Sequence, residues 1–137
     1  EEASDCGSAI QRAGLDRIYL LAPTSDLVRM REVAAVASGF VYYVSVKGVT
    51  GDKTFNADEV AQKVALLRSV TSLPIGVGFG IKSPAAAAAL AAISDAVIVG
   101  SALVEIIERG TDAQIGALAL EQFVATLRRA LDASRAA

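Results

Sequence analysis

The residues best suited to chemistry are glycines at the ends of two predicted strands. Three glycines fall within the stretch PIGVGFGI at residues 74–81, and Gly100 and Ser101 follow the next apolar run. Glycine lets an anion approach the backbone closely, and the first N–H groups of a helix direct positive partial charge towards it. Either cluster alone is typical of a tight turn or a capped helix, but the pair on successive strands favours a phosphate-binding site.

Two nucleotide-binding motifs are nearly present, but each lacks a required residue. A dinucleotide fingerprint beginning at Gly76 continues correctly to Gly78, but Ile81 stands where the sixth-position glycine is needed. The stretch GVTGDKT at residues 48–54 ends like a P-loop but has no glycine directly before Lys53. We therefore expect neither a Rossmann site nor a P-loop.

Composition excludes several further classes of site. The 137 residues include no histidine and one cysteine, Cys6, which removes His-based metal sites, Ser–His and Cys–His pairs and internal disulfide bonds. The formal net charge of -2, without clustered basic residues, gives no electrostatic footprint for nucleic acid or an anionic membrane. We expect a cytoplasmic protein without a metal site, and with neither nucleic acid nor a membrane as partner.

Short apolar runs that alternate with amphipathic helices must hold the glycine clusters in place. Strands are expected at residues 17–22, 40–45, 74–77 and 96–99. Helices are expected at residues 1–13, at 26–37, after Asn56, after Ser83, at 101–108 and at 113–133. The expected N-cap residues are Ser25, Asn56 and Ser83, and Val60, Val64 and Leu67 share one helical face.

This alternation predicts consecutive right-handed βαβ units around a parallel sheet. Such a short series fits either a small open doubly wound sheet or half of an eight-unit barrel, whose full length is typically about 250 residues. In barrels, the loops after strands seven and eight form a phosphate site with the start of a short extra helix. The two glycine-ended strands therefore favour an α/β fold of the (β/α)8 TIM-barrel class, of which this chain covers about half.

Motifs along nearly the whole chain resemble the tryptophan synthase alpha chain family. They are LDRIYLLAPTS, GFVYYVSVKGVTG, LPIGVGFGIKSP and DAVIVGSALVEII. The resemblance implies that residues 1–137 are the carboxyl-terminal half of a single barrel domain, strands five to eight. It implies a lyase of tryptophan biosynthesis that cleaves indole-3-glycerol phosphate to indole and glyceraldehyde 3-phosphate. The family passes indole to a beta chain that carries pyridoxal phosphate, so we expect no cofactor on this chain.

The resemblance also implies which residues touch the substrate. It places the phosphate at Gly51, Gly80, Gly100 and Ser101, a substrate-facing tyrosine at Tyr42, the indole pocket beside Phe79, and a loop threonine that orients a catalytic aspartate at Thr50. Two of these have simpler interpretations from the residues alone. Either Tyr42 or Tyr43 must face the barrel interior, where it could equally be packing, and Thr50 could be an ordinary loop residue.

Catalytic carboxylates are not expected in this chain. Proton transfer at the indole ring and the glycerol hydroxyl requires two carboxylates of differing pKa. In the family these are a glutamate and an aspartate near strand two, which would precede residue 1. The acids that remain are expected at helix starts, before a strand, on solvated helix faces or in a loop: Asp58, Glu59, Asp95, Glu105, Glu108, Glu121 and Asp52.

The expected partners follow from this incomplete site. They are indole-3-glycerol phosphate, a beta chain, and either the amino-terminal half-barrel or a second copy of this chain, and the chain alone is predicted to be inactive. Two alternatives remain open at this stage: another phosphate-binding barrel enzyme, or a non-catalytic half-barrel that serves binding or assembly.

Overall fold

One parallel four-stranded sheet organises the computed structural model, which describes residues 2–45, 56–78, 80–110 and 112–136. The strands are β1 (Tyr19–Leu21), β2 (Val41–Val44), β3 (Ile75–Gly78) and β4 (Ala96–Ile98). They lie side by side in chain order, β1-β2-β3-β4. A doubly wound sheet reverses its strand order at a switch point, whereas a barrel adds each strand beside the last. The unbroken order therefore confirms the prediction of half a barrel.

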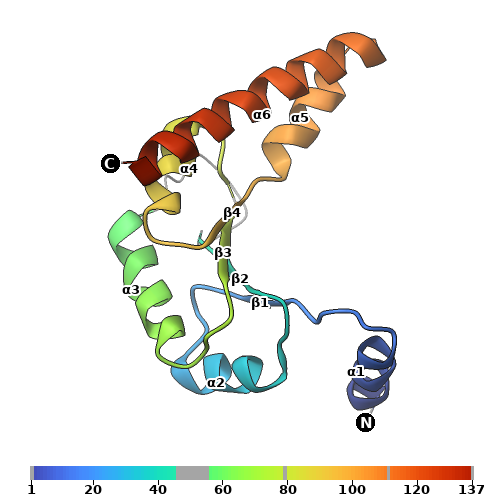
Figure 1. The fold of residues 1–137 in the computed structure, drawn as a ribbon, viewed down its shortest axis with the longest axis vertical. Coiled ribbons are helices and arrows are strands. Elements are labelled where there is room, and N and C mark those ends of the chain that lie inside the picture. Colours follow the sequence, from blue (N-terminus) through green and yellow to red (C-terminus); the bar gives the residue numbers. More distant parts are fainter. Residues whose placement is uncertain (1, 46–55, 79, 111, 137) are drawn as a thin grey trace.

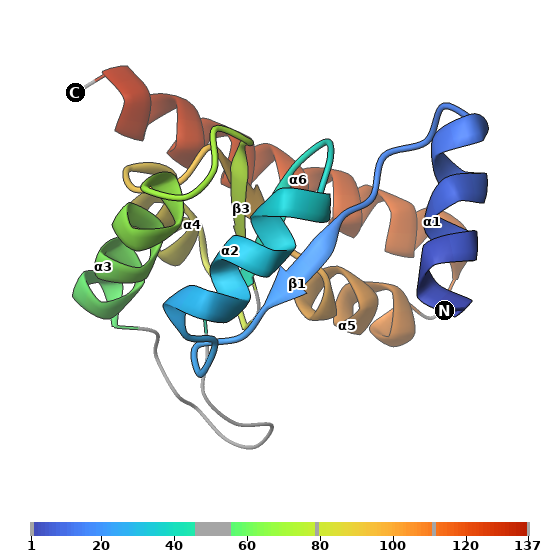
Figure 2. The ribbon, with the colours of Figure 1, turned by 90° about the horizontal axis from the view of Figure 1, so that it is seen from below.

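Three of the helices connect successive strands and lie on one side of the sheet (Figure 1). The helices are α1 (Glu2–Arg12), α2 (Leu27–Val36), α3 (Ala57–Arg68), α4 (Pro84–Ala91), α5 (Ser101–Arg109) and α6 (Ala113–Ala136). Helices α2, α3 and α4 line one face, α6 packs across α4 and α5, and α1 lies apart from the sheet (Figures 1 and 2). Among the described segments, no helix covers the opposite face (Figure 1).

Alternation along the strands decides which side chains enter the core. Val41 and Tyr43 of β2 are buried beneath the helices, as are Ile75 and Val77 of β3. The predicted apolar face of α3, with Val60, Val64 and Leu67, packs into the same cluster and is confirmed. On β1, Leu21 is 1% exposed, whereas its neighbour Leu20 on the other face is 62% exposed. The core thus lies between the sheet and its helices, and the inner face remains open.

Two of the three predicted N-caps are confirmed. The Asn56 side chain accepts hydrogen bonds from the N–H groups of Asp58 and Glu59, and Ser83 caps α4 with Pro84 in the first turn. The prediction for Ser25 is wrong, because Asp26 caps α2.

The Ser25 hydroxyl has a different partner in the turn after β1. It accepts a hydrogen bond from the N–H of Ala22 at 3.1 Å. Helix α2 begins at Leu27, so the residue directly before it is Asp26, whose carboxylate accepts from the N–H of Arg29. Either residue type suits an N-cap, and the position of the helix start decides between them.

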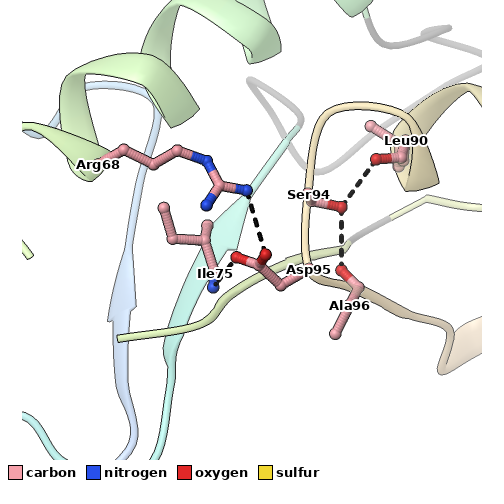
Figure 3. Close-up of polar contacts among 6 residues, drawn as sticks. All are labelled: Arg68, Ile75, Leu90, Ser94, Asp95 and Ala96. Atoms are coloured by element: carbon pink, nitrogen blue, oxygen red, sulfur yellow. Dashed lines mark hydrogen bonds and ion pairs between the residues drawn. The ribbon is translucent and has the colours of Figure 1, made fainter. Parts of the chain in front are cut away.

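Asp95 ties together the amino-terminal ends of β3 and β4 (Figure 3). One carboxylate oxygen accepts a hydrogen bond from the N–H of Ile75 at 2.8 Å, and the other accepts from the Arg68 guanidinium at 3.2 Å. The backbone N–H of Asp95 in turn donates to the carbonyl of Ile75 at 3.0 Å. The acid expected merely to precede a strand is therefore a structural link at the end of the sheet opposite the glycine clusters.

Replacing this carboxylate should destabilise the chain. We expect Asp95→Ala to lower the free energy of unfolding by about 1–3 kcal/mol, because it removes the acceptor of the N–H of the fully buried Ile75. The control is Glu32→Ala, which removes an ion pair with Arg29 in which both side chains are about 60% exposed, and which should cost less than about 1 kcal/mol. Urea unfolding of both variants measures the difference, and equal losses would contradict the assigned role.

Candidate phosphate-binding site

The two glycine clusters lie at the carboxyl ends of neighbouring strands. Gly78 of β3 is paired with Ile98 of β4. Gly80 and Gly100 each follow two residues beyond this pair. Because both strands run in the same direction, the two glycines leave the sheet at the same edge. The structure thus brings these predicted site residues to adjacent strand ends.

Gly80 adopts a backbone conformation that favours glycine. Its φ angle is +75°, in the left-handed region, and the residue is exposed. A side chain there would be strained, so the turn itself requires glycine. The same exposure leaves the backbone accessible to a bound group, and the turn and the predicted anion contact are compatible.

The start of α5 is open in a way that suits an anion. Gly100 is the N-cap and no side chain caps the helix, so the simpler interpretation of Ser101 as a cap is wrong. Leu103 and Val104 donate their N–H groups to the Gly100 carbonyl. The N–H groups of Ser101 and Ala102 consequently have no acceptor within the helix. A Cβ built on Gly100 meets nothing within 4 Å, which leaves room beside these donors.

Tyr42 and Tyr43 have opposite surroundings. Tyr43 is 2% exposed within the core beneath the helices, and its burial, followed by the negative charge of Glu59, raises the pKa of its hydroxyl above 10.0. Tyr42 is half-buried on the open inner face. Its hydroxyl oxygen lies 2.9 Å from the point where a Cβ on Gly78 would stand. The Tyr42 hydroxyl therefore lies beside Gly78 on the inner face, whereas Tyr43 packs in the core.

Three further residues predicted to touch substrate, Thr50, Gly51 and Phe79, lie outside the described residues. So does Asp52, the loop acid.

An ion pair links the segment after β3 to α5. The Lys82 ammonium lies 3.0 Å from one carboxylate oxygen of Glu105, and the Arg109 guanidinium lies 3.6 Å from the other. The hydrogen bond from Lys82 holds the pKa of Glu105 below its ordinary value of 4.5. Glu105 is therefore paired rather than simply solvated, and a carboxyl group with a lowered pKa is a poor proton donor near neutral pH.

One polar contact at this edge is not predicted by the sequence. Ser45, directly after β2, donates its hydroxyl to the carbonyl oxygen of Gly78 at 2.9 Å. A serine at the end of a predicted strand carries no signal of this contact, since its partner is set by the pairing of β2 with β3.

A separate cavity lies on the helix side of β4. It has a volume of about 240 Å³ and is apolar apart from Arg128, and Val97, Val99 and residues of α6 are among those that line it. No predicted phosphate-binding residue lines it.

Within the described part of the chain, no group of histidine, cysteine, aspartate and glutamate side chains is arranged to hold a metal ion. The described helices also include none with the length and apolar character needed to span a bilayer.

Comparison with known families decides the affiliation. The family model described as "Tryptophan synthase alpha chain" matches residues 1–132. The chain belongs to the tryptophan synthase alpha chain family. It is 48% identical over 132 residues to the tryptophan synthase alpha chain of Dechloromonas aromatica, covering 96% of this chain and 49% of that relative. It is 46% identical over 135 residues to the one from Nitrosococcus oceani, covering 98% of this chain and 50% of the relative.

Solved structures of alpha chains share the fold. The tryptophan synthase alpha subunit of Legionella pneumophila superposes with a TM-score of 0.78 and 33% sequence identity, covering 96% of this chain and 48% of that one. A tryptophan synthase structure from M. tuberculosis gives a TM-score of 0.78 at 32% identity, with 95% and 46% covered. This chain thus has the fold of about half of the family's TIM barrel, and it spans about half the length of the relatives it matches.

Proposed function

We propose that this chain supplies the phosphate-binding half of a tryptophan synthase alpha chain, a lyase that cleaves indole-3-glycerol phosphate to indole and glyceraldehyde 3-phosphate. Family membership supports the reaction. The observation that supports a phosphate-binding role for this half is the open start of α5 at Gly100. It lies next to the strand end that leads to Gly80. Backbone N–H groups at such a place suit a dianionic phosphate without any basic side chain.

In this proposal, the phosphate oxygens accept hydrogen bonds from backbone N–H groups at Gly80, Gly100 and Ser101, and at Gly51. Binding there fixes one end of the substrate, so that the rest extends across the inner face of the sheet. Tyr42 then faces the bound substrate and Phe79 lies beside the indole ring. Thr50 orients the catalytic aspartate. Anchoring the phosphate contributes to catalysis by holding the reacting carbon in one geometry.

The reaction breaks the bond between the indole ring and the glycerol chain. A proton must be added to the ring carbon that leaves, and another must be removed from the adjacent glycerol hydroxyl as it becomes a carbonyl. We assign both transfers to a glutamate and an aspartate of the amino-terminal half. The acids described here have other surroundings: Asp58 and Glu59 start α3, Asp95 binds the N–H of Ile75, and Glu105 is ion-paired.

The proposed partners cover the surfaces that this half leaves open. The exposed Leu20 and the half-buried Tyr42 on the inner face suit an amino-terminal half-barrel, or a second copy of the chain in its absence. A beta chain is the proposed recipient of indole, with pyridoxal phosphate expected on that chain and no cofactor on this one. The proposed location is the cytoplasm.

A binding comparison tests the substrate. In the complete barrel, we expect indole-3-glycerol phosphate to bind more tightly than glucose 6-phosphate and more tightly than inorganic phosphate, because the inner face adds contacts to the indole ring. Calorimetric titration with each compound measures this order. Equal affinity for all three would favour a different phosphate-binding barrel enzyme, and the absence of any phosphate binding would favour an assembly module.

A further inference from the structure

Ser45 holds one carbonyl oxygen with two donors. Its backbone N–H and its hydroxyl each lie 2.9 Å from the carbonyl oxygen of Gly78. The residue is 9% exposed, so this contact is largely shielded from water. A buried hydrogen bond of this kind fixes direction as well as position, because two donors from different parts of one residue converge on a single acceptor.

Gly78 is also confined from the other sides. A Cβ placed on it would lie 2.7 Å from the carbonyl oxygen of Ile98 and 2.9 Å from the hydroxyl of Tyr42. Groups from β2 and β4 therefore enclose this last residue of β3. Gly80 follows two residues later and carries the left-handed turn. The Gly78 carbonyl is thus held immediately before the chain enters the proposed phosphate-binding turn.

We propose that Ser45 is a positioning residue for phosphate binding: by holding the Gly78 carbonyl, it sets the direction in which the chain leaves β3 for Gly80. This inference rests on the proposed function of that turn. Ser45 acts through Gly78 and does not itself need to touch the phosphate. A small change in the direction of a backbone donor weakens a hydrogen bond steeply, so the hydroxyl influences affinity from a distance.

The chain provides a matched control at the other end of the sheet. Ser94 is 8% exposed, and its hydroxyl lies 2.7 Å from the carbonyl oxygen of Leu90 and 3.1 Å from that of Ala96 (Figure 3). It is the same residue type with a similar exposure, and its hydroxyl also bonds a backbone carbonyl. It precedes β4, however, instead of following a strand. A loss that arises only from reduced stability should appear equally in variants of both serines.

The experiment compares Ser45→Ala, Ser45→Cys and Ser94→Ala in the complete alpha chain that contains these residues. Cysteine keeps the shape of the side chain with a slightly larger atom in place of oxygen, and its thiol is only a weak donor. Inorganic phosphate is titrated while the backbone amide signals of Gly80, Gly100 and Ser101 are followed by NMR, and kcat and KM are measured with indole-3-glycerol phosphate. We expect both Ser45 variants to bind phosphate about fivefold more weakly, as for the loss of one buried hydrogen bond, with KM raised and kcat little changed. Ser94→Ala should bind phosphate like the parent protein.

The outcomes separate this inference from the proposed function. If the amides of the parent protein do not respond to phosphate, the proposed function fails first. If the parent responds and the Ser45 variants bind phosphate as tightly as it does, the positioning role is wrong. Equal weakening in the Ser45 and Ser94 variants, in proportion to their loss of stability, would also overturn it.

Discussion

Joining this chain to the amino-terminal half of an alpha chain should convert an inactive protein into one that releases indole from indole-3-glycerol phosphate. The chain alone is expected to lack the acid and the base that transfer the two protons. Each such group typically contributes 10²- to 10⁴-fold, so turnover by the chain alone should fall at least about 10⁴-fold below that of the joined protein. Indole production, followed by its fluorescence, measures both. Indole release by the chain alone at a comparable rate would show that an acid and a base lie within residues 1–137.

Each isolated half serves as a control for the activity of the joined protein. Either half alone should be inactive, and an equimolar mixture should recover activity if the open faces dock without a covalent link. By itself, the 14.1 kDa chain should sediment as a dimer or larger species, because its inner face exposes Leu20 and the edges of β1 and β4 are unpaired within the described sheet. Mixing should replace that species with a one-to-one complex. A monodisperse monomer in sedimentation would count against the docking surface.

Features that depend on neighbours in the sequence were predictable. The caps at Asn56 and Ser83 and the buried face of Val60, Val64 and Leu67 follow from local rules of helix formation, and all are observed. The N-cap prediction at Ser25 was wrong because Asp26, one residue later, is an equally good cap. The choice between them depends on where α2 begins. Helix α6 continues to Ala136, beyond its predicted end at residue 133, because local sequence defines the ends of a helix less sharply than its interior.

Features that depend on strand pairing were only partly predictable. Parallel strands alone predict that Gly80 and Gly100 follow strand ends at the same edge of the sheet, and the register of β3 against β4 confirms it. The choice between Tyr42 and Tyr43 required knowledge of which face the helices cover. The partner of Ser45 lies 33 residues away, and its identity requires the register of β2 against β3. Sequence spacing fixes a period but not a register, so such contacts appear only in the folded chain.

Comparing alanine variants of Gly78 and Gly100 should separate effects on stability from effects on phosphate binding. A Cβ on Gly78 would lie 2.7 Å from the Ile98 carbonyl oxygen and 2.8 Å from the Ile98 Cβ, and neither can move without shifting β4. We expect Gly78→Ala to lower the free energy of unfolding by about 1–3 kcal/mol, the usual cost of overpacking a well-filled site. It should also weaken phosphate binding, because the same shift displaces the strand ends. Urea unfolding and phosphate titration of the complete alpha chain measure the two effects.

Gly100→Ala should also weaken phosphate binding, but with a smaller loss of stability. Its Cβ meets no other atom within 4 Å, but its φ of −123° and ψ of −75° lie outside the main α and β regions, and it is an N-cap. Alanine is a poorer N-cap than glycine, so the stability loss should be about 1 kcal/mol, smaller than that of Gly78→Ala. The added methyl group nevertheless occupies the open space beside the α5 N–H groups where the phosphate is proposed to sit, and affinity should fall. A larger loss of stability at Gly78 than at Gly100, with weakened phosphate binding at both, is a pattern that a purely structural role for the two glycines would not produce. If Gly100→Ala binds phosphate normally, the start of α5 is not the anion site, and the openness of that helix start has another cause.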